Sequence, residues 1–275
     1  MTEARDVRRV SVEPSRRCSK GCSFCYNGSS AEGELGWAED ELVAFALDCA
    51  ANGVESISIG GGEPLEYPPL LSVLSRLEGR IARTLTSNGL ALDSDPALLA
   101  RLCDARPDKV HVSVHSPENQ REVERSARVA IAIDARGVHS GINLLVRKSR
   151  VAEARAAFAR LIELGFTPGH IVILPARGDG GADTPSANEV ASVAGGTRFQ
   201  SMSCLTGCAA SARFASIASD KTAAWCSYTR ERRPLAELTF AALRAALDGL
   251  GIDPCDNGLV RSIKTSSPSR ERAPR

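Results

Sequence analysis

The 275-residue chain lacks any apolar run approaching the roughly 18 residues that span a bilayer, and its N-terminus lacks the apolar core of a signal peptide. It also lacks an excess of either charge, because 34 Lys and Arg side chains stand against 33 Asp and Glu side chains, for a formal net charge of +1. No net field therefore draws it toward nucleic acid or an anionic membrane. We expect a cytoplasmic protein with neither nucleic-acid nor membrane partners.

Cysteine, in contrast, is abundant. Nine cysteines is an odd count, and the cytoplasm keeps thiols reduced, so a disulfide framework does not explain them. Metal ligation or catalysis is the leading explanation for most of them. Cys49 and Cys103 stand among Ala and Leu on expected helices, and we assign these two to the core.

Short β-branched runs recur along the first two thirds of the chain, each followed by a stretch with helical periodicity. They lie at residues 9–12, 55–59, 83–86, 110–114, 141–146 and 170–174. After the first interval their centres are about thirty residues apart, which is the size of one strand–helix–strand crossover. Amphipathic helices are predicted at residues 37–51 and 151–164. The predicted fold class is α/β, a partial parallel (β/α)6 barrel with a small C-terminal hairpin–helix extension.

The repeat of alternating strands and helices ends near residue 195. Residues 213–217 and 222–225 predict a β-hairpin, and residues 235–250 predict a helix that Gly251 ends. Ser186 and Glu189 form a capping-box pattern that predicts a short helix just before the boundary. We divide the chain into a core at residues 1–194, a cysteine-containing extension at 195–258 and a disordered basic tail at 259–275.

Three cysteines, Cys18, Cys22 and Cys25, crowd one short segment directly after the first expected strand. Three thiolates on one tight loop can hold one metal centre. A cubane iron–sulfur cluster takes four cysteines when fully ligated, so a cluster held by this loop would keep one iron open for another ligand. The alternative is a zinc site completed by a distant Cys or His, although zinc loops favour two close ligands followed by a long gap.

The Cys-x3-Cys-x2-Cys loop resembles the signature of the radical S-adenosylmethionine (SAM) superfamily, and the resemblance continues over about residues 8–175. After the second strand, Gly60-Gly-Gly-Glu-Pro64 is similar to the family segment that meets the methionyl amino group of SAM. After the third, Thr86-Ser-Asn-Gly89 is similar to the family's polar loop on the ribose and carboxylate side. The resemblance implies SAM contacts at Phe24, Tyr26, Gly61, Gly62, Glu63, Ser87, Asn88, Ser113 and Asn143.

These loops also suit a ligand on physical grounds. Glycines at a strand's end let the backbone approach a ligand closely, and Pro64 biases Glu63 away from helix so that it can face the mouth. Parallel α/β folds collect ligand contacts at the carboxyl ends of their strands, where Ser87 and Asn88 stand. The alternatives are an ordinary tight turn at the glycines and local turn capping at Ser87 and Asn88.

The resemblance implies an enzyme that cleaves SAM reductively at a [4Fe–4S] cluster on Cys18, Cys22 and Cys25. A 5′-deoxyadenosyl radical would then abstract hydrogen from a small-molecule or peptide substrate, with a flavodoxin- or ferredoxin-type electron donor. Seventeen residues precede Cys18, too few for a peptide-recognition domain, which favours a small metabolite unless a separate protein delivers a peptide. The alternative is a non-enzymatic iron–sulfur carrier or scaffold, which has no use for the glycine and polar loops.

The fourth expected strand and the residue after it alternate valine with His111, Ser113 and His115. The valines should meet the outer helices, so the polar set faces the barrel interior, with His115 nearest the mouth. We expect His115 to contact substrate or cofactor; the alternative is a hydrogen-bonded structural histidine. His139 precedes its strand and belongs at the opposite end. Arg177 follows the sixth strand and can hold a substrate carboxylate or phosphate, or be a solvated loop arginine.

The extension contains Cys204, Cys208 and Cys226, with Cys255 farther along the chain. A close pair followed by a hairpin that ends in a third cysteine resembles the auxiliary-cluster extensions of this superfamily and implies a second iron–sulfur cluster. Such hairpins usually bear a glycine where this chain has Lys221. The alternative is that these cysteines are small buried residues under the hairpin.

Overall fold

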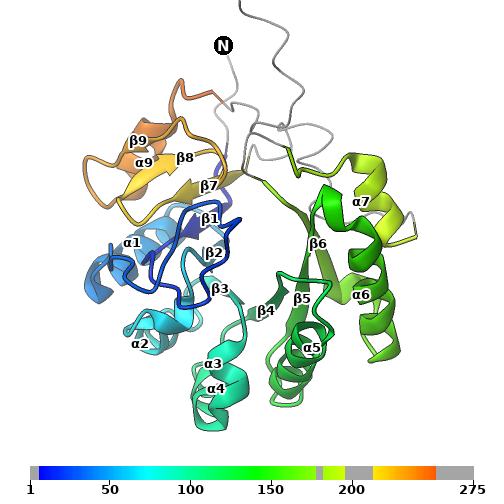
Figure 1. The fold of residues 1–275 in the computed structure, drawn as a ribbon. Helices are drawn as coiled ribbons and strands as arrows, with labels where there is room; N and C mark the ends of the chain where they lie inside the picture. Colours follow the sequence, from blue (N-terminus) through cyan, green and yellow to red (C-terminus); the bar gives the residue numbers. More distant parts are fainter. Residues whose placement is uncertain (1–5, 178–181, 196–212, 252–275) are drawn as a thin grey trace, which may run out of the picture.

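The computed structural model describes residues 6–177, 182–195 and 213–251 (Figure 1). One nine-stranded sheet organises these residues, in the order β6-β5-β4-β3-β2-β1-β7-β8-β9. The strands are β1 (Arg9–Val12), β2 (Ser56–Ile59), β3 (Ala82–Ser87), β4 (Lys109–Val114), β5 (Ser140–Val146), β6 (Ile171–Pro175), β7 (Phe214–Ile217), β8 (Thr222–Ala224) and β9 (Arg233–Pro234).

Strands β1 to β6 are parallel, and each pairs with the next in sequence. Helical segments separate them and lie on the outside of the curved sheet (Figure 1). The α-helices are α1 (Glu39–Ala51), α2 (Leu70–Arg76), α3 (Leu90–Ser94), α4 (Pro96–Asp104), α5 (Gln120–Asp134), α6 (Val151–Glu163), α7 (Ala187–Val193) and α9 (Phe240–Leu247), with 3-10 turns η1 (Pro64–Glu66), η2 (Lys148–Arg150) and η3 (Pro168–His170). The predicted partial parallel (β/α)6 barrel is confirmed.

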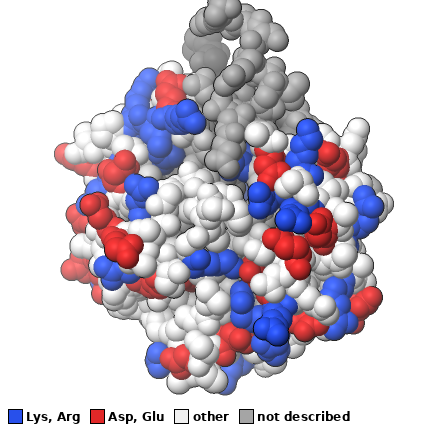
Figure 2. All heavy atoms as spheres, in the orientation of Figure 1, with Lys and Arg blue, Asp and Glu red and all other residues white. Residues whose placement is uncertain are grey.

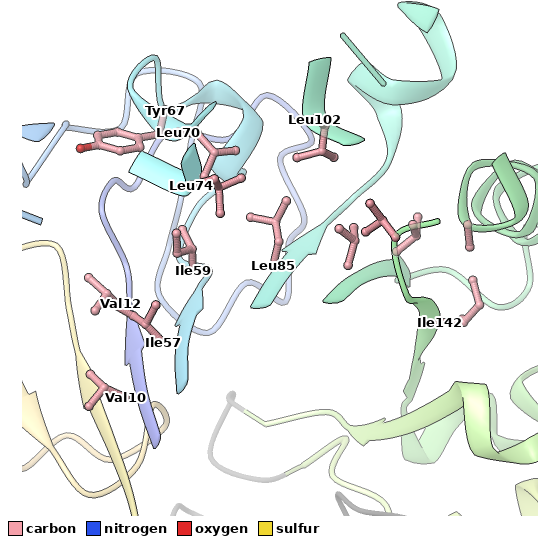
Figure 3. Packing of buried hydrophobic residues seen from close by; sticks show 14 of the residues in the cluster. Val10, Val12, Ile57, Ile59, Tyr67, Leu70, Leu74, Leu85, Leu102 and Ile142 are labelled. Carbon is pink, nitrogen blue, oxygen red and sulfur yellow. The ribbon is translucent and has the colours of Figure 1, made fainter. Parts of the chain in front are cut away.

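The alternation of side chains on β4 separates the two faces of the barrel wall. Val110, Val112 and Val114 are fully buried in the hydrophobic core. Figure 3 shows the equivalent packing on β1 and β2 of the same sheet, where Val10 and Ile57 belong to the same cluster. Burying one such side chain contributes about 1.5–3 kcal/mol. The apolar face therefore fixes the strands against the helices and leaves the polar residues of β4 on the inner face.

The C-terminal extension continues the barrel sheet. The predicted hairpin is confirmed, because β7 and β8 are antiparallel with Ser216 opposite Ala224. Strand β7 also pairs in parallel with β1, on the side away from β2. Lys221 lies in the hairpin turn with φ of 63°, the left-handed region that favours glycine. Its ammonium group pairs with the Glu41 carboxylate at 2.8 Å, which holds the turn against α1.

Two helices begin later than the sequence predicts. Helix α1 begins after Ala38, whose N–H donates to the Glu41 side chain at 3.0 Å. Helix α9 is shorter at both ends than predicted, because the side chain of Thr239 caps its first turn and Asp248 leaves the helical conformation. The predicted capping box at α7 is confirmed, since Ser186 Oγ accepts from Glu189 N–H at 3.2 Å.

None of the helices that the structure describes is long and apolar enough to cross a membrane. On the face drawn in Figure 2, basic and acidic side chains are interspersed. This distribution agrees with the near-neutral composition of the chain.

Candidate active site

A cavity of about 520 Å³ occupies the interior of the barrel and reaches the carboxyl ends of its strands. Its volume lies within the range of about 300–1,000 Å³ that is typical of ligand sites. Every predicted site residue that the structure describes lines this one cavity, while Cys204 and Cys208 lie outside the described residues. These lining residues are Cys18, Cys22, Phe24, Cys25, Tyr26, Gly61, Gly62, Glu63, Ser87, Asn88, Ser113, His115, Asn143, Arg177 and Cys226.

The three-cysteine loop leaves β1 and is ordered by backbone hydrogen bonds. Cys18 N–H donates to Ser30 O at 2.7 Å, and Cys25 N–H donates to Cys22 O at 3.1 Å. All three cysteines are half-buried on the cavity wall. Burial raises the pKa of the Cys18 and Cys22 thiols, and the charge of Lys20 opposes that rise at Cys22.

The donor set of this loop suits a thiolate-ligated cluster, because three thiols of one short segment face the same cavity. The thiols are not yet gathered, since no three Cys, His, Asp or Glu side chains form a metal-binding group within the described ranges. The Cys25 thiol instead donates to Asn27 Oδ1 at 3.0 Å.

The glycine loop after β2 packs tightly against the segment that leaves β1. A Cβ on Gly62 would lie 2.1 Å from Arg17 O, and one on Gly61, which has φ of 93°, would lie 2.7 Å from Glu13 Cβ. A Cβ on Gly60 would meet nothing within 4 Å. Gly61 and Gly62 line the cavity as predicted, but close backbone packing is what requires glycine at these two positions.

Glu63 is buried, with 3% of its surface exposed. Its Oε2 accepts a hydrogen bond from Asn88 N–H at 2.7 Å, and its Oε1 accepts one from Leu65 N–H at 3.2 Å. Burial raises the pKa of Glu63 to about 7, although hydrogen bonds from Asn88, Ser87 and Leu65 favour the charged form. The carboxylate that we expected to face the mouth is therefore engaged in joining the loops after β2 and β3.

Ser87 and Asn88 turn the chain from β3 into α3. Asn88 Oδ1 accepts from Leu90 N–H at 2.8 Å, and Ser87 Oγ accepts from Gly89 N–H at 3.0 Å. Gly89 adopts φ of 74°, as the predicted strand-to-helix loop requires. The Asn88 side-chain amide also approaches the cysteine loop, since its Nδ2 lies 4.0 Å from Cys18 Sγ on the cavity wall.

Ser113 and Asn143 pair across β4 and β5 and line the cavity together. Behind them, His111 Nδ1 lies 2.8 Å from Asn143 Oδ1, and Asn143 Nδ2 donates to Thr86 Oγ1 at 3.5 Å. Burial lowers the pKa of His111 to about 4, so its imidazole is neutral at neutral pH and donates through Nδ1. The ring fits because Gly141, its partner on β5, has no side chain. His111 thus orients Asn143, a role that the sequence did not predict.

His115 lies just beyond β4 on the cavity wall, as predicted. Its Nδ1 is buried and has no hydrogen-bond partner among the residues that the structure describes. The Phe24 ring lies 6.3 Å away between centroids, and the Arg147 guanidinium lies 5.3 Å from the Phe24 centroid. Burial and the charge of Lys20 lower the pKa of His115, which keeps its ring neutral at neutral pH. His139, in contrast, does not line the cavity.

Arg177 follows β6 and is 7% exposed on the cavity wall. The alternative of a solvated loop arginine is therefore wrong. A guanidinium group at the edge of a cavity can hold a carboxylate or phosphate through two parallel hydrogen bonds.

The extension meets the cysteine loop at Tyr26. Tyr26 Oη donates to Glu13 Oε1 at 2.7 Å, and the Tyr26 ring packs edge-on against Tyr228 with centroids 5.0 Å apart. Tyr228 N–H donates to Cys226 Sγ at 3.4 Å, and both residues line the cavity. Glu13 and Tyr228 were missed by sequence reasoning. The position of Glu13 directly after β1 was the only signal for it.

Comparisons with known proteins place the chain in a family. The family model described as Radical SAM superfamily matches residues 12–183, which is more than half of the chain. The GTP 3′,8-cyclase of Geobacter sulfurreducens is 30% identical over 189 residues, which cover 62% of this chain and 57% of that protein. The probable GTP 3′,8-cyclase of Methanopyrus kandleri is 31% identical over 124 residues, which cover 44% and 39%. The chain thus spans about half the length or less of these curated relatives.

Solved structures share the fold. Streptococcus suis SuiB bound to precursor peptide SuiA has a TM-score of 0.65 at 15% identity, covering 95% of this chain and 68% of that chain. The anSMEcpe structure with bound AdoMet and the Cp18Cys peptide has a TM-score of 0.61 at 13% identity, covering 86% and 80%. At these identities the likeness establishes the fold.

Proposed function

The chain belongs to the radical SAM superfamily, and we propose that it cleaves SAM reductively at a [4Fe–4S] cluster held by Cys18, Cys22 and Cys25. One observation carries the proposal: the three thiols line the same cavity as residues from the ends of β2, β3, β4 and β5. A carrier or scaffold would need the thiols alone. The convergence of these strand ends supports an enzyme that holds an organic ligand beside the cluster.

Bound there, the cluster would supply one electron to the sulfonium of SAM, giving methionine and a 5′-deoxyadenosyl radical that takes a hydrogen atom from the substrate. The protein's part is to bind and orient the reactants and to exclude water. Glu63 would act through Asn88, whose backbone it holds. The proposed SAM-binding positions are Phe24, Tyr26, Gly61, Gly62, Glu63, Ser87, Asn88, Ser113 and Asn143.

We assign the substrate side of the cavity to His115 and Arg177. The imidazole lines the cavity, and its Nδ1 has no hydrogen-bond partner within the described part of the chain. The Arg177 guanidinium on the same cavity wall would hold an anionic group of the substrate.

The substrate that we propose is a small molecule or a peptide. The curated relatives support the first class, because their name specifies GTP. The peptide in the SuiB structure supports the second. Deuterium transfer from labelled substrate into 5′-deoxyadenosine would separate true substrates from molecules that merely bind.

A second iron–sulfur cluster at Cys204, Cys208 and Cys226, with Cys255 as a possible fourth ligand, is the finer part of the proposal. Its support is that Cys226 lines the same cavity as the three-cysteine loop. The other three cysteines lie outside the described residues. A flavodoxin- or ferredoxin-type protein is the proposed electron donor.

The deciding experiment is anaerobic reconstitution followed by incubation with SAM and dithionite. Chromatography should detect 5′-deoxyadenosine with the parent protein and none when Cys18, Cys22 and Cys25 are all replaced by alanine, because each thiolate supplies one iron ligand. If the triple variant makes the product at the parent rate, the proposed function is wrong.

A further inference from the structure

We propose that Glu122 is a positioning residue that fixes the three-cysteine loop against the end of β4 through its ion pair with Lys20. Lys20 stands between Cys18 and Cys22, and it lines the cavity. Glu122 is the third residue of α5. Lys20 occupies one of the variable positions of the Cys-x3-Cys-x2-Cys loop, and Glu122 lies outside the motifs on which the superfamily resemblance rests.

One carboxylate oxygen makes the connection. Glu122 Oε1 accepts from Lys20 Nζ at 2.8 Å, from His115 N–H at 2.7 Å and from Ser116 N–H at 3.3 Å. The loop with the cysteines and the strand end with His115 therefore share a single anchor. The anchor is itself fixed, because Asn119 caps α5 and its side chain accepts from Glu122 N–H at 3.3 Å.

The ion pair is largely shielded from water. The side chains of Lys20 and Glu122 are 13% and 6% exposed. Arg125 Nη2 lies 4.0 Å from Glu122 Oε2 and adds positive charge on the other side of the carboxylate. Removing one member of such a buried pair leaves the other uncompensated, so the loop must open to return the remaining charge to water.

Glu124 on the same helix provides a matched contrast. Its Oε1 pairs with Arg160 Nη2 at 3.2 Å, and both side chains are more than one third exposed. Exposed pairs of this kind contribute little to stability. The two glutamates therefore separate a general effect of removing charge from α5 from a specific effect on the loop.

The inference rests on the proposed function only for the identity of the group that the loop binds. Opening of the loop can be measured in the full-length protein before any cluster or SAM is added. Absence of SAM cleavage by the parent protein would contradict the proposed function, whereas unchanged loop opening in Glu122→Gln would contradict the role of Glu122, so the two failures are distinguishable.

The direct test is native-state trypsin digestion, with mass spectrometry of the peptides that end at Lys20. In the parent protein the Lys20 side chain is engaged, so cleavage of the Lys20–Gly21 bond requires local opening of the loop. Glu122→Gln should accelerate this cleavage about tenfold or more, because one buried partner is lost. Glu124→Gln should cleave at the parent rate. Equal rates for Glu122→Gln and the parent would overturn the proposal.

A second variant tests the same ion pair even if Glu122→Gln simply unfolds the protein. Lys20→Met leaves the Glu122 bonds to His115 and Ser116 in place, and amide hydrogen exchange should still quicken across residues 18–25. The double variant should exchange no faster than the faster single variant, because both changes break the same pair. Unchanged exchange in Lys20→Met, or additive acceleration in the double variant, would contradict the inference.

Discussion

The Glu63 carboxylate accepts a hydrogen bond from the backbone N–H of Asn88 at 2.7 Å, inside the protein. This contact joins the loop after β2 to the loop after β3, and these loops follow neighbouring strands of the sheet. Asn88 in turn directs its amide nitrogen toward Cys18 Sγ, 4.0 Å away. A change at Glu63 should therefore reach the cysteine loop through Asn88.

The first prediction concerns this link. Glu63→Ala and Asn88→Ala should each weaken SAM binding roughly five- to a hundredfold, because each removes a hydrogen bond that orients the polar loop and one of them involves a charged group. Iron content should stay at the parent level, since neither residue ligates iron in our assignment. Calorimetry or equilibrium dialysis on reconstituted protein would measure the affinity.

The control for this prediction is Glu39→Ala, which removes an acidic side chain at the start of α1 that pairs with Arg76 at 2.9 Å, away from the cavity lining. Its SAM affinity should equal that of the parent protein. Unchanged binding in both Glu63→Ala and Asn88→Ala would remove these loops from the SAM site.

His111 leads to a prediction about pH. Its pKa in the fold is about 4, below the ordinary value of 6.5, so folding favours the neutral ring. The resulting stability is fully present above about pH 6.5 and is lost as the pH falls toward 4, by about 3 kcal/mol in total. His111→Gln should lack this loss, so the stability difference between the parent and the variant should shrink on acidification.

Urea unfolding of the parent and His111→Gln proteins between pH 7.5 and 4 would measure this difference, because groups common to both proteins cancel. A difference that stays constant over that range would show that His111 is not held neutral by the fold.

His115 and His139 test the assignment of the inner face. His115→Ala should impair turnover of the true substrate more than it impairs SAM cleavage without substrate, because His115 lies on the cavity wall. His139→Ala should change neither beyond a stability cost. Assays of substrate product and 5′-deoxyadenosine in parallel would compare the two variants. Equal effects of His115→Ala and His139→Ala would show that the inner-face position of His115 has no functional role.

Much of the barrel was predictable because its signals are local. Val110, Val112 and Val114 alternate with polar residues, which fixes both the strand and its buried face. The pairing of β7 with β1 was not predictable, because it joins residues about two hundred positions apart and no local pattern specifies it. The start of α9 was also missed, since the capping Thr239 follows four residues, 235–238, with equally helical character.

The site residues at the strand ends could be predicted because sequence motifs mark them. All the predicted site residues that the structure describes line one cavity. Residues that act through other residues were missed. His111, Glu13 and Glu122 touch the site through Asn143, Tyr26 and Lys20 respectively. Such contacts depend on tertiary packing, so a single sequence does not reveal them.

The last prediction concerns the second cluster. Cys226 lines the cavity, and its carbonyl oxygen accepts from Arg232 Nη1 at 3.3 Å, which ties the end of the hairpin in place. If Cys226 binds a cluster with Cys204 and Cys208, protein in which Cys18, Cys22 and Cys25 are alanine should retain about four irons per chain after reconstitution. Cys226→Ala added to that variant should abolish the remaining iron. Iron analysis and absorption spectra would measure both. A colourless, iron-free triple variant would contradict the second cluster, but it would not bear on the proposal that the parent protein cleaves SAM at the first cluster.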